Sequence, residues 1–299
     1  MKIAKGGIAF FDSGIGGLTV LSACREYLPN ALFYYYGDNH HAPYGNLPPN
    51  KIRRYVRRAF RLFARLKVRA VVMACNTATA LCIEELRKRY AFPIIGTEPA
   101  VFAAARLGGI AYVLTTRATY ESARFKKLCY EAEKQYPRAK LIPIPCDNLA
   151  GEIERHLGEE GYDFTPFLPK GNPDVVVLGC THYIYIEEVV GEFYHCPVVH
   201  GNDGIAFRLY NILSKMEKST TQPSKSVCNR ENRPYLTTSY KRGVFYSQKR
   251  ALYPNIATKN GEVIFLGKCK VVNKIQHEQM FACENRLKTW RSGQKKQKK

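Results

Sequence analysis

The 299-residue chain lacks the cysteine spacing of a zinc domain or a disulfide-stapled domain. It has ten cysteines, and no two of them form a C-x-x-C pair, so they fit neither a disulfide framework nor a zinc site. The chain also lacks an apolar run near the roughly 20 residues of a membrane span, and its first apolar stretch is too short for a signal peptide. We therefore expect reduced thiols, a cytoplasmic location and no membrane span.

The marks of a cofactor site are missing as well. No His, Asp or Glu cluster has the spacing of metal ligands, and no lysine stands in a context typical of pyridoxal phosphate. The glycine-rich stretch at residues 12–17 matches neither the G-x-G-x-x-G nor the P-loop pattern, which argues against a nucleotide. Its backbone N–H groups suit a substrate carboxylate better. The sequence thus predicts no metal and no cofactor, so side chains and backbone dipoles must do the chemistry.

Acidic residues are scarce, and the formal net charge is +21. Residues 219–299 carry 18 Lys and Arg against 4 acids, and residues 51–69 carry nine basic residues and no acid. In the second segment apolar residues recur at helical spacing with arginines on the other side, which is typical of a solvated helix face; an anionic partner is the alternative. The basic C-terminal extension is expected to bind polyanions nonspecifically, in a salt-dependent way.

Predicted strands and helices alternate through residue 204, and the alternation restarts after residues 98–99. We expect an α/β fold of two pseudo-symmetric lobes with mostly parallel sheets flanked by helices, and an active site in the cleft between them. The lobes would span residues 1–98 and 99–204, and residues 205–299 would form a helix returning to the first lobe plus a basic extension. Predicted elements discussed below are helices at 14–27, 51–66, 184–193 and 272–286, and a strand at 262–266.

Two cysteines stand where a predicted strand ends and a helix begins: Cys75 in AVVMACNTATA and Cys180 in DVVVLGCTHYI. Open α/β sheets bind ligands at the carboxyl ends of their strands, so both thiols should face one pocket. Either cysteine alone would more often be a small core residue. Both, however, are followed by polar residues and by a helix start that favours the thiolate. One thiolate can take a proton from carbon while the opposite thiol returns one, which predicts a two-base racemase or epimerase.

Five motifs resemble, in order and spacing, those of the glutamate racemases of the aspartate/glutamate racemase superfamily. They are IAFFDSGIGGLTVL (8–21), YYGDNHHAPYG (35–45), ACNTATA (74–80), PIIGTEPA (93–100) and LGCTHY (178–183). The resemblance covers residues 3–213 and implies the two-lobed fold. It also implies a cofactor-independent isomerase that interconverts L- and D-glutamate and supplies D-glutamate for peptidoglycan synthesis.

The resemblance also implies roles for individual residues. Cys75 would take the proton from D-glutamate and Cys180 the proton from L-glutamate, with Asp12 assisting the first thiol and His182 the second. The residues implied to contact the ammonium group and the two carboxylates of glutamate are Asp12, Ser13, Tyr44, Gly45, Asn76, Thr77, Thr181 and His182.

The chain departs from the family pattern at three places. Asn39-His40-His41-Ala42 stands where the family has a Thr-Ala-Arg-Val run, and Ile184 replaces a proline after the CTHY motif. The acidic residue that the family places near the His-bearing thiol has no Leu-Val-Glu context here, and Glu152 is the predicted substitute.

Two alternatives remain open from the sequence. Aspartate racemases share the fold and the thiol pair, but they typically have an acid where this chain has His182, which favours glutamate. A nucleic-acid-binding protein on a racemase-like scaffold would explain the arginines and the basic extension, but no aromatic base-stacking motif accompanies them. The sequence also leaves a homodimer open.

Overall fold

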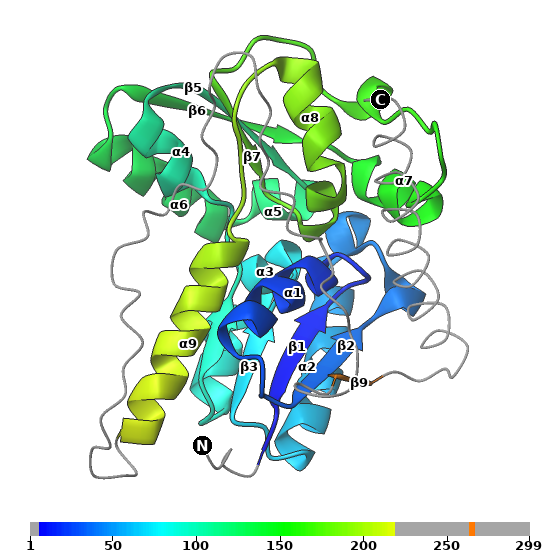
Figure 1. Cartoon of the computed structure of the whole chain (residues 1–299), viewed down its shortest axis with the longest axis vertical. Helices are drawn as coiled ribbons and strands as arrows, with labels where there is room; N and C mark the ends of the chain where they lie inside the picture. The colour runs from blue at the N-terminus through cyan, green and yellow to red at the C-terminus, as the bar shows by residue number, and fades with distance from the viewer. Residues whose placement is uncertain (1–5, 219–262, 267–299) are drawn as a thin grey trace, which may run out of the picture.

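The computed structural model describes residues 6–218 and 263–266, which form two α/β lobes (Figure 1). One lobe contains a five-stranded sheet of order β4-β3-β1-β2-β9, and the other a four-stranded sheet of order β6-β5-β7-β8. Every strand pair in both sheets is parallel, as expected where helices connect successive strands. The predicted fold class is confirmed. Within the described ranges, no helix is both long and apolar enough to cross a bilayer.

The first lobe has helices on both faces of its sheet. Side chains alternate along β1, so Ile8 and Phe10 enter one core while Ala9 and Phe11 enter the other. The first core is closed by α1 and α9, and the second by α2 and α3. The bounds are β1 (Ile8–Asp12), α1 (Gly17–Tyr27), β2 (Phe33–Gly37), α2 (Pro49–Arg65), β3 (Ala70–Met73), α3 (Asn76–Arg89) and β4 (Ile94–Gly96).

The second lobe repeats this layering around β5 and β7. Val113 and Val177 pack on the side covered by α4 and α6, whereas Leu114 and Leu178 pack on the side of α7 and α8. The bounds are α4 (Val101–Leu107), β5 (Gly109–Thr115), α5 (Arg117–Glu121), α6 (Ala123–Gln135), β6 (Ala139–Pro145), α7 (Leu149–His156), β7 (Val175–Leu178), α8 (Glu187–Tyr194) and β8 (Val198–Val199). Glu98, the predicted lobe boundary, lies between β4 and α4.

Two later elements return to the first lobe. Helix α9 (Asn202–Lys218) runs along it and packs on α1, as Figure 1 shows. Strand β9 (Val263–Phe265) pairs in parallel with the outer edge of β2. The strand predicted at 262–266 is therefore confirmed, and it covers an edge that β2 would otherwise expose. The predicted helix at 272–286 and the rest of the basic extension lie outside the described residues.

Two predicted helices begin later than the sequence pattern indicated. The helix predicted at 14–27 starts at Gly17, because the backbone N–H of Gly14 is bound by the Asp12 carboxylate at 2.9 Å in a tight turn. The helix predicted at 184–193 is wrong over its first turn, which belongs to a 3₁₀ segment, η4 (Thr181–Ile186), before α8 begins. In η4 the Tyr183 hydroxyl donates to the Cys146 carbonyl at 3.1 Å, which holds this segment against the end of β6.

Candidate active site

The end of β1 carries a buried carboxylate at the junction of the two lobes. Asp12 is fully buried, and its Oδ1 accepts a hydrogen bond at 3.3 Å from the hydroxyl of Thr181, which belongs to the second lobe. Burial raises the pKa of Asp12, although the charge of His182 and two backbone N–H groups of the glycine-rich turn oppose this rise. The carboxyl group is thus placed where it can exchange protons with its neighbours.

Cys75 follows β3 and is the N-cap of α3. Its sulfur accepts from the backbone N–H of Ala78 at 3.5 Å, and its thiol donates to Ser13 Oγ at 3.6 Å. Burial, followed by the charge of Asp12, raises the pKa of Cys75 to about 12, despite these two contacts. In this state the Cys75 thiol therefore keeps its proton at neutral pH.

Cys180 follows β7 and has a different set of partners. Its sulfur lies 3.7 Å from Nδ1 of His182, and Nε2 of the same ring lies 2.7 Å from Glu154 Oε1. Burial lowers the pKa of His182, but the bonds to Cys180 and Glu154 outweigh it and raise that pKa well above its usual value. The imidazole is thus held as a cation between a sulfur and a carboxylate.

The predicted auxiliary acid, Glu152, is wrong. Glu152 contacts Arg155 and the Tyr162 hydroxyl, whereas Glu154 contacts the histidine. Glu154 approaches closely because the turn after β1 has no side chain at Gly14, where a Cβ would collide with the Glu154 carboxylate.

The two thiols belong to one buried site. Cys75 and Cys180 are 5 % and 7 % exposed; the charge of Asp12 acts on the first, and Nδ1 of His182 lies 3.7 Å from the sulfur of the second. Charge on Cys180 also contributes to the raised pKa of Cys75. The structure therefore brings together Asp12, Ser13, Cys75, Cys180, Thr181 and His182.

The remaining predicted residues line the same junction. Thr77 Oγ1 lies 2.8 Å from Thr116 Oγ1 and 3.3 Å from Thr119 Oγ1, so three hydroxyls from both lobes form one cluster. Asn76 is 8 % exposed, and its Oδ1 has no hydrogen-bond partner among the described residues. A buried acceptor of this kind calls for a donor. Thr116 and Thr119 were missed by the sequence analysis, since only the close approach of the lobes brings them to Thr77.

The segment that departs from the family pattern is organised around Asp38. The Tyr44 hydroxyl donates to Asp38 Oδ2 at 2.6 Å, and His41 Nδ1 lies 2.9 Å from the other oxygen. The His41 ring also stacks on Tyr55 of α2 at 3.8 Å between centroids. Gly45 lies against Thr116, where a Cβ would come within 2.8 Å of the threonine Cβ. His41 therefore holds the loop that presents Tyr44 and Gly45.

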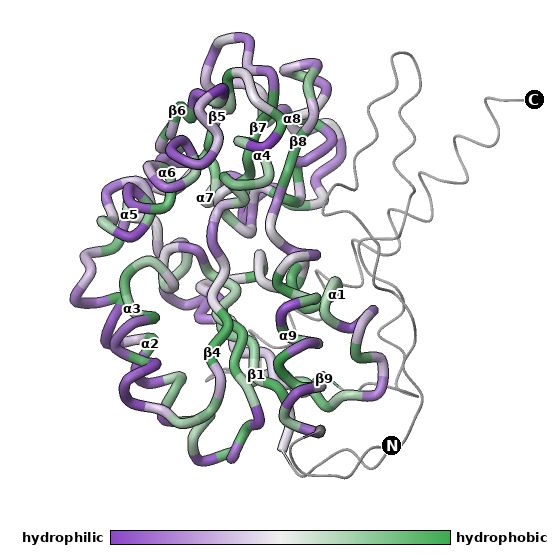
Figure 2. The backbone as a smooth tube through the Cα atoms, turned by 90° about the vertical axis from the view of Figure 1, so that its left-hand side faces the viewer, coloured by the Kyte–Doolittle hydropathy of each residue, from purple (hydrophilic) through white to green (hydrophobic). Residues whose placement is uncertain are grey.

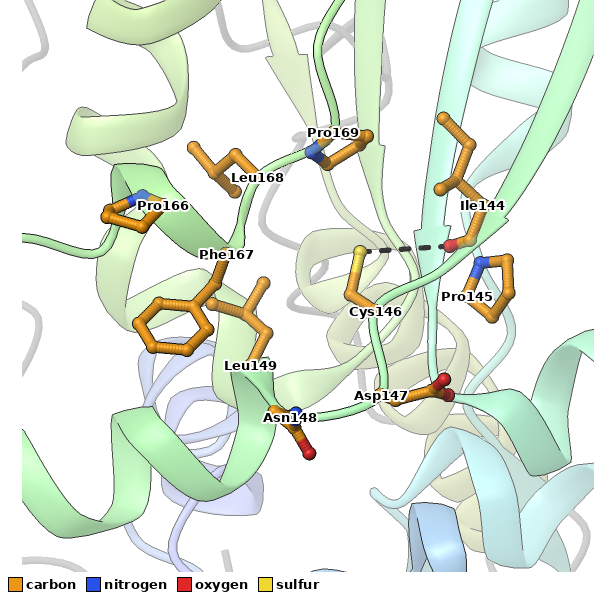
Figure 3. Close-up of a pocket in the computed structure, with 10 residues that line it drawn as sticks. All are labelled: Ile144, Pro145, Cys146, Asp147, Asn148, Leu149, Pro166, Phe167, Leu168 and Pro169. Carbon is orange, nitrogen blue, oxygen red and sulfur yellow. Dashed lines mark hydrogen bonds between the residues drawn. The ribbon is translucent and has the colours of Figure 1, made fainter.

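A separate cavity of about 310 Å³ lies beside the end of β6, between the start of α7 and the 3₁₀ turn η3 (Thr165–Phe167) (Figure 3). Apolar side chains, including Leu149 and Phe167, line most of it. The Cys146 thiol in its wall donates to the Ile144 carbonyl at 3.8 Å, and burial raises the pKa of Cys146 to about 12. In the part of the chain that the structure describes, no group of His, Cys, Asp and Glu could hold a metal ion.

A family model described as Asp/Glu/Hydantoin racemase matches residues 19–206. The chain belongs to this racemase family. It is 38 % identical over 233 residues to a glutamate racemase of Clostridium perfringens, a match that covers 73 % of this chain and 87 % of the relative. A glutamate racemase of Clostridium botulinum is 34 % identical over 255 residues, covering 81 % and 98 % of the two chains.

Solved structures of the racemase family share the fold. The Escherichia coli glutamate racemase, determined with L-glutamate and the activator UDP-MurNAc-ala, has a TM-score of 0.62 and 29 % identity, covering 70 % of this chain and 83 % of that one. Glutamate racemase isoform RacE1 of Bacillus anthracis also has a TM-score of 0.62, with 27 % identity, covering 71 % and 82 %. The chain is thus an isomerase of the racemase type, and the resemblance to glutamate racemases stated from its motifs is confirmed.

Proposed function

We propose that this chain interconverts L- and D-glutamate without a cofactor, using Cys75 and Cys180 as two bases on opposite sides of the α-carbon. One observation carries the proposal. The two thiols come from corresponding strand ends of the two lobes, and each has its own ionisable partner: Asp12 for Cys75, and His182 for Cys180.

The proton held by Cys75 suits the reaction that starts from L-glutamate. The pKa of Cys75, raised to about 12, keeps its thiol protonated, and in the proposed reaction Cys180 acts as the thiolate base, with Nδ1 of His182 3.7 Å from its sulfur. With L-glutamate, the α-proton passes to the Cys180 sulfur, and the electron pair left on carbon takes the Cys75 proton on the opposite face. The products are D-glutamate, a Cys180 thiol and a Cys75 thiolate. Proton exchange through His182 and Asp12 with solvent then restores the starting state.

The substrate would bind through a buried amide oxygen and a cluster of threonine hydroxyls. Asn76 Oδ1, buried without a donor among the described residues, would accept a hydrogen bond from the ammonium group. The hydroxyls of Thr77, Thr116 and Thr119 would donate to a carboxylate. The other predicted contacts, from Ser13, Tyr44, Gly45 and Thr181, are part of the same proposal.

We predict that purified protein racemises L-glutamate in the absence of added pyridoxal phosphate, with kcat/KM for L-aspartate lower by at least about tenfold. A side chain shorter by one methylene would leave the threonine hydroxyls without their carboxylate partner. Optical rotation during incubation with each amino acid measures this. Chelators and carbonyl reagents serve as controls and should leave the rate unchanged. Faster turnover of aspartate would favour the aspartate racemase alternative, and no turnover of either would contradict the proposal.

Replacement of the two acids on α7 tests the positioning of His182. Glu154→Gln is predicted to lower kcat by up to about 100-fold, because the imidazole loses the partner that orients it. It should also shift the alkaline limb of the pH–kcat profile to lower pH, since Glu154 raises the pKa of His182. Glu152→Gln is the matched control, and its activity should stay within about twofold of wild type. Equal losses in the two variants, or an unshifted pH profile in Glu154→Gln, would contradict this role.

We further propose that the D-glutamate formed serves peptidoglycan synthesis. The motif resemblance supports this role, as does the kind of relatives found, glutamate racemases of bacteria. The cytoplasmic location and the homodimer remain predictions.

A further inference from the structure

Helix α2 presents a row of positive charge that the racemase reaction does not use. Its exposed cations recur at intervals of three or four residues, and we call this row the arginine stripe. It consists of Lys51, Arg54, Arg58, Arg61 and Arg65. At about 100° per residue the five side chains fall within an arc of about 80° on the helix surface. Figure 2 shows α2 as a mostly hydrophilic helix at the outer side of the first lobe.

The stripe lies opposite the face that α2 buries. Ile52, Val56, Phe60 and Phe63 are fully buried in the core under the sheet. The stripe is therefore turned away from the protein along a length of about 21 Å, from the rise of 1.5 Å per residue. The helix contains no acidic residue. Like charges three and four residues apart repel one another, so the stripe opposes helix formation.

The flanking arginines behave differently. Arg57 forms two hydrogen bonds to the Glu85 carboxylate, at 2.7 and 2.8 Å, and Arg53 donates to the Leu81 carbonyl at 3.3 Å, both on α3. In contrast, no hydrogen bond or ion pair holds the side chains of Arg54, Arg61 and Arg65 within residues 6–218 and 263–266. The fold thus neutralises the flank of α2 next to α3, whereas Arg54, Arg61 and Arg65 have no such partner among the described residues.

We propose that the arginine stripe binds the phosphate backbone of a nucleic acid and that this binding does not depend on the base sequence. Over about 21 Å, duplex DNA presents about 12 phosphates, so a straight row of five cations can contact one strand. Arginine, which makes up four of the five, matches phosphate oxygens bidentately. An interfacial membrane helix inserts its apolar face, and α2 has none to spare because that face is already in the core.

The experiment uses the full chain and a fluorescent 20-base-pair duplex of arbitrary sequence. The triple variant Arg54→Gln, Arg61→Gln, Arg65→Gln is compared with wild type between 50 and 200 mM salt. A scattered triple variant, Arg106→Gln, Lys126→Gln, Lys134→Gln, removes the same charge from exposed positions on α4 and α6 and is the control. Both variants should keep wild-type racemisation rates, because none of the six residues contacts the site.

The stripe variant is expected to bind the duplex at least about tenfold more weakly at 50 mM salt. The slope of log K against log salt should fall in magnitude by about 2.7, at 0.9 for each phosphate that an arginine no longer neutralises. The scattered variant should keep the wild-type slope. The same weakening in both variants, or in neither, would overturn the proposal. The proposal would also be overturned if the stripe variant bound the duplex as wild type does but was no longer retained on phosphatidylserine vesicles. That result would assign the stripe to membranes.

Discussion

Replacing either Cys75 or Cys180 by serine is expected to lower racemisation of glutamate by at least about 10³-fold in both directions, because a serine hydroxyl is too weak an acid to replace a thiol in either step. Each variant keeps one competent thiol. Cys75→Ser should therefore still exchange the α-proton of L-glutamate with deuterium from solvent, and Cys180→Ser that of D-glutamate. Proton NMR of each enantiomer in deuterated water follows this exchange directly.

The matched control is Cys146→Ser. Cys146 also follows a strand of the second lobe and has a pKa raised to about 12 by burial, but among the described residues its thiol bonds to a backbone carbonyl beside the cavity of Figure 3. Its serine variant should racemise glutamate at close to the wild-type rate. If either active-site serine variant kept near-normal racemisation, or if the surviving exchange occurred on the opposite enantiomer, the assignment of the two thiols would be incorrect.

The second large effect concerns the partners of the thiols. His182→Asn should reduce kcat most with L-glutamate, and Asp12→Asn should reduce it most with D-glutamate, each by about 10²-fold or more. The equilibrium constant between enantiomers is 1, so kcat/KM must remain equal in the two directions for every variant. The asymmetry should thus appear in kcat and KM separately, measured from each enantiomer at saturation.

A control on the same lobe is His200→Asn. His200 is partly buried and lies 3.5 Å from Glu187, and it contacts neither thiol among the described residues, so its replacement should affect stability more than kcat. Equal reductions of kcat from both enantiomers in His182→Asn and Asp12→Asn would indicate that these residues bind substrate and do not serve one thiol each.

The sequence predicted those site residues whose motifs are short and continuous in the chain. Cys75 and Cys180 follow strands rich in valine, and parallel strands present their carboxyl ends at one edge of a sheet, so the sequence pattern alone places each thiol at the carboxyl edge of its own sheet. His182 is identified for the same reason, being two residues from a thiol. The buried face of α2 is also readable, since its apolar residues repeat with the helical period.

A local sequence pattern could not show whether Glu152 or Glu154 contacts His182. Two residues apart on a helix, their side chains point about 200° apart, and both positions suit an acid. Only the docking of α7 against η4 decides which carboxylate meets His182. Likewise, which arginines of α2 are neutralised depends on where α3 lies, not on any pattern within α2.

The sequence by itself thus determined the alternation of strands and helices, the two thiol-bearing strand ends and the family, because these depend on short periodic patterns and local motifs. Tertiary structure alone decided the contacts between distant segments. Examples are Thr181 bound to Asp12, the three-threonine cluster, Glu154 on His182 and β9 on the edge of β2. The physical reason is that each of these contacts joins residues far apart in the chain. They meet only when distant elements pack together, and no local sequence pattern specifies that packing.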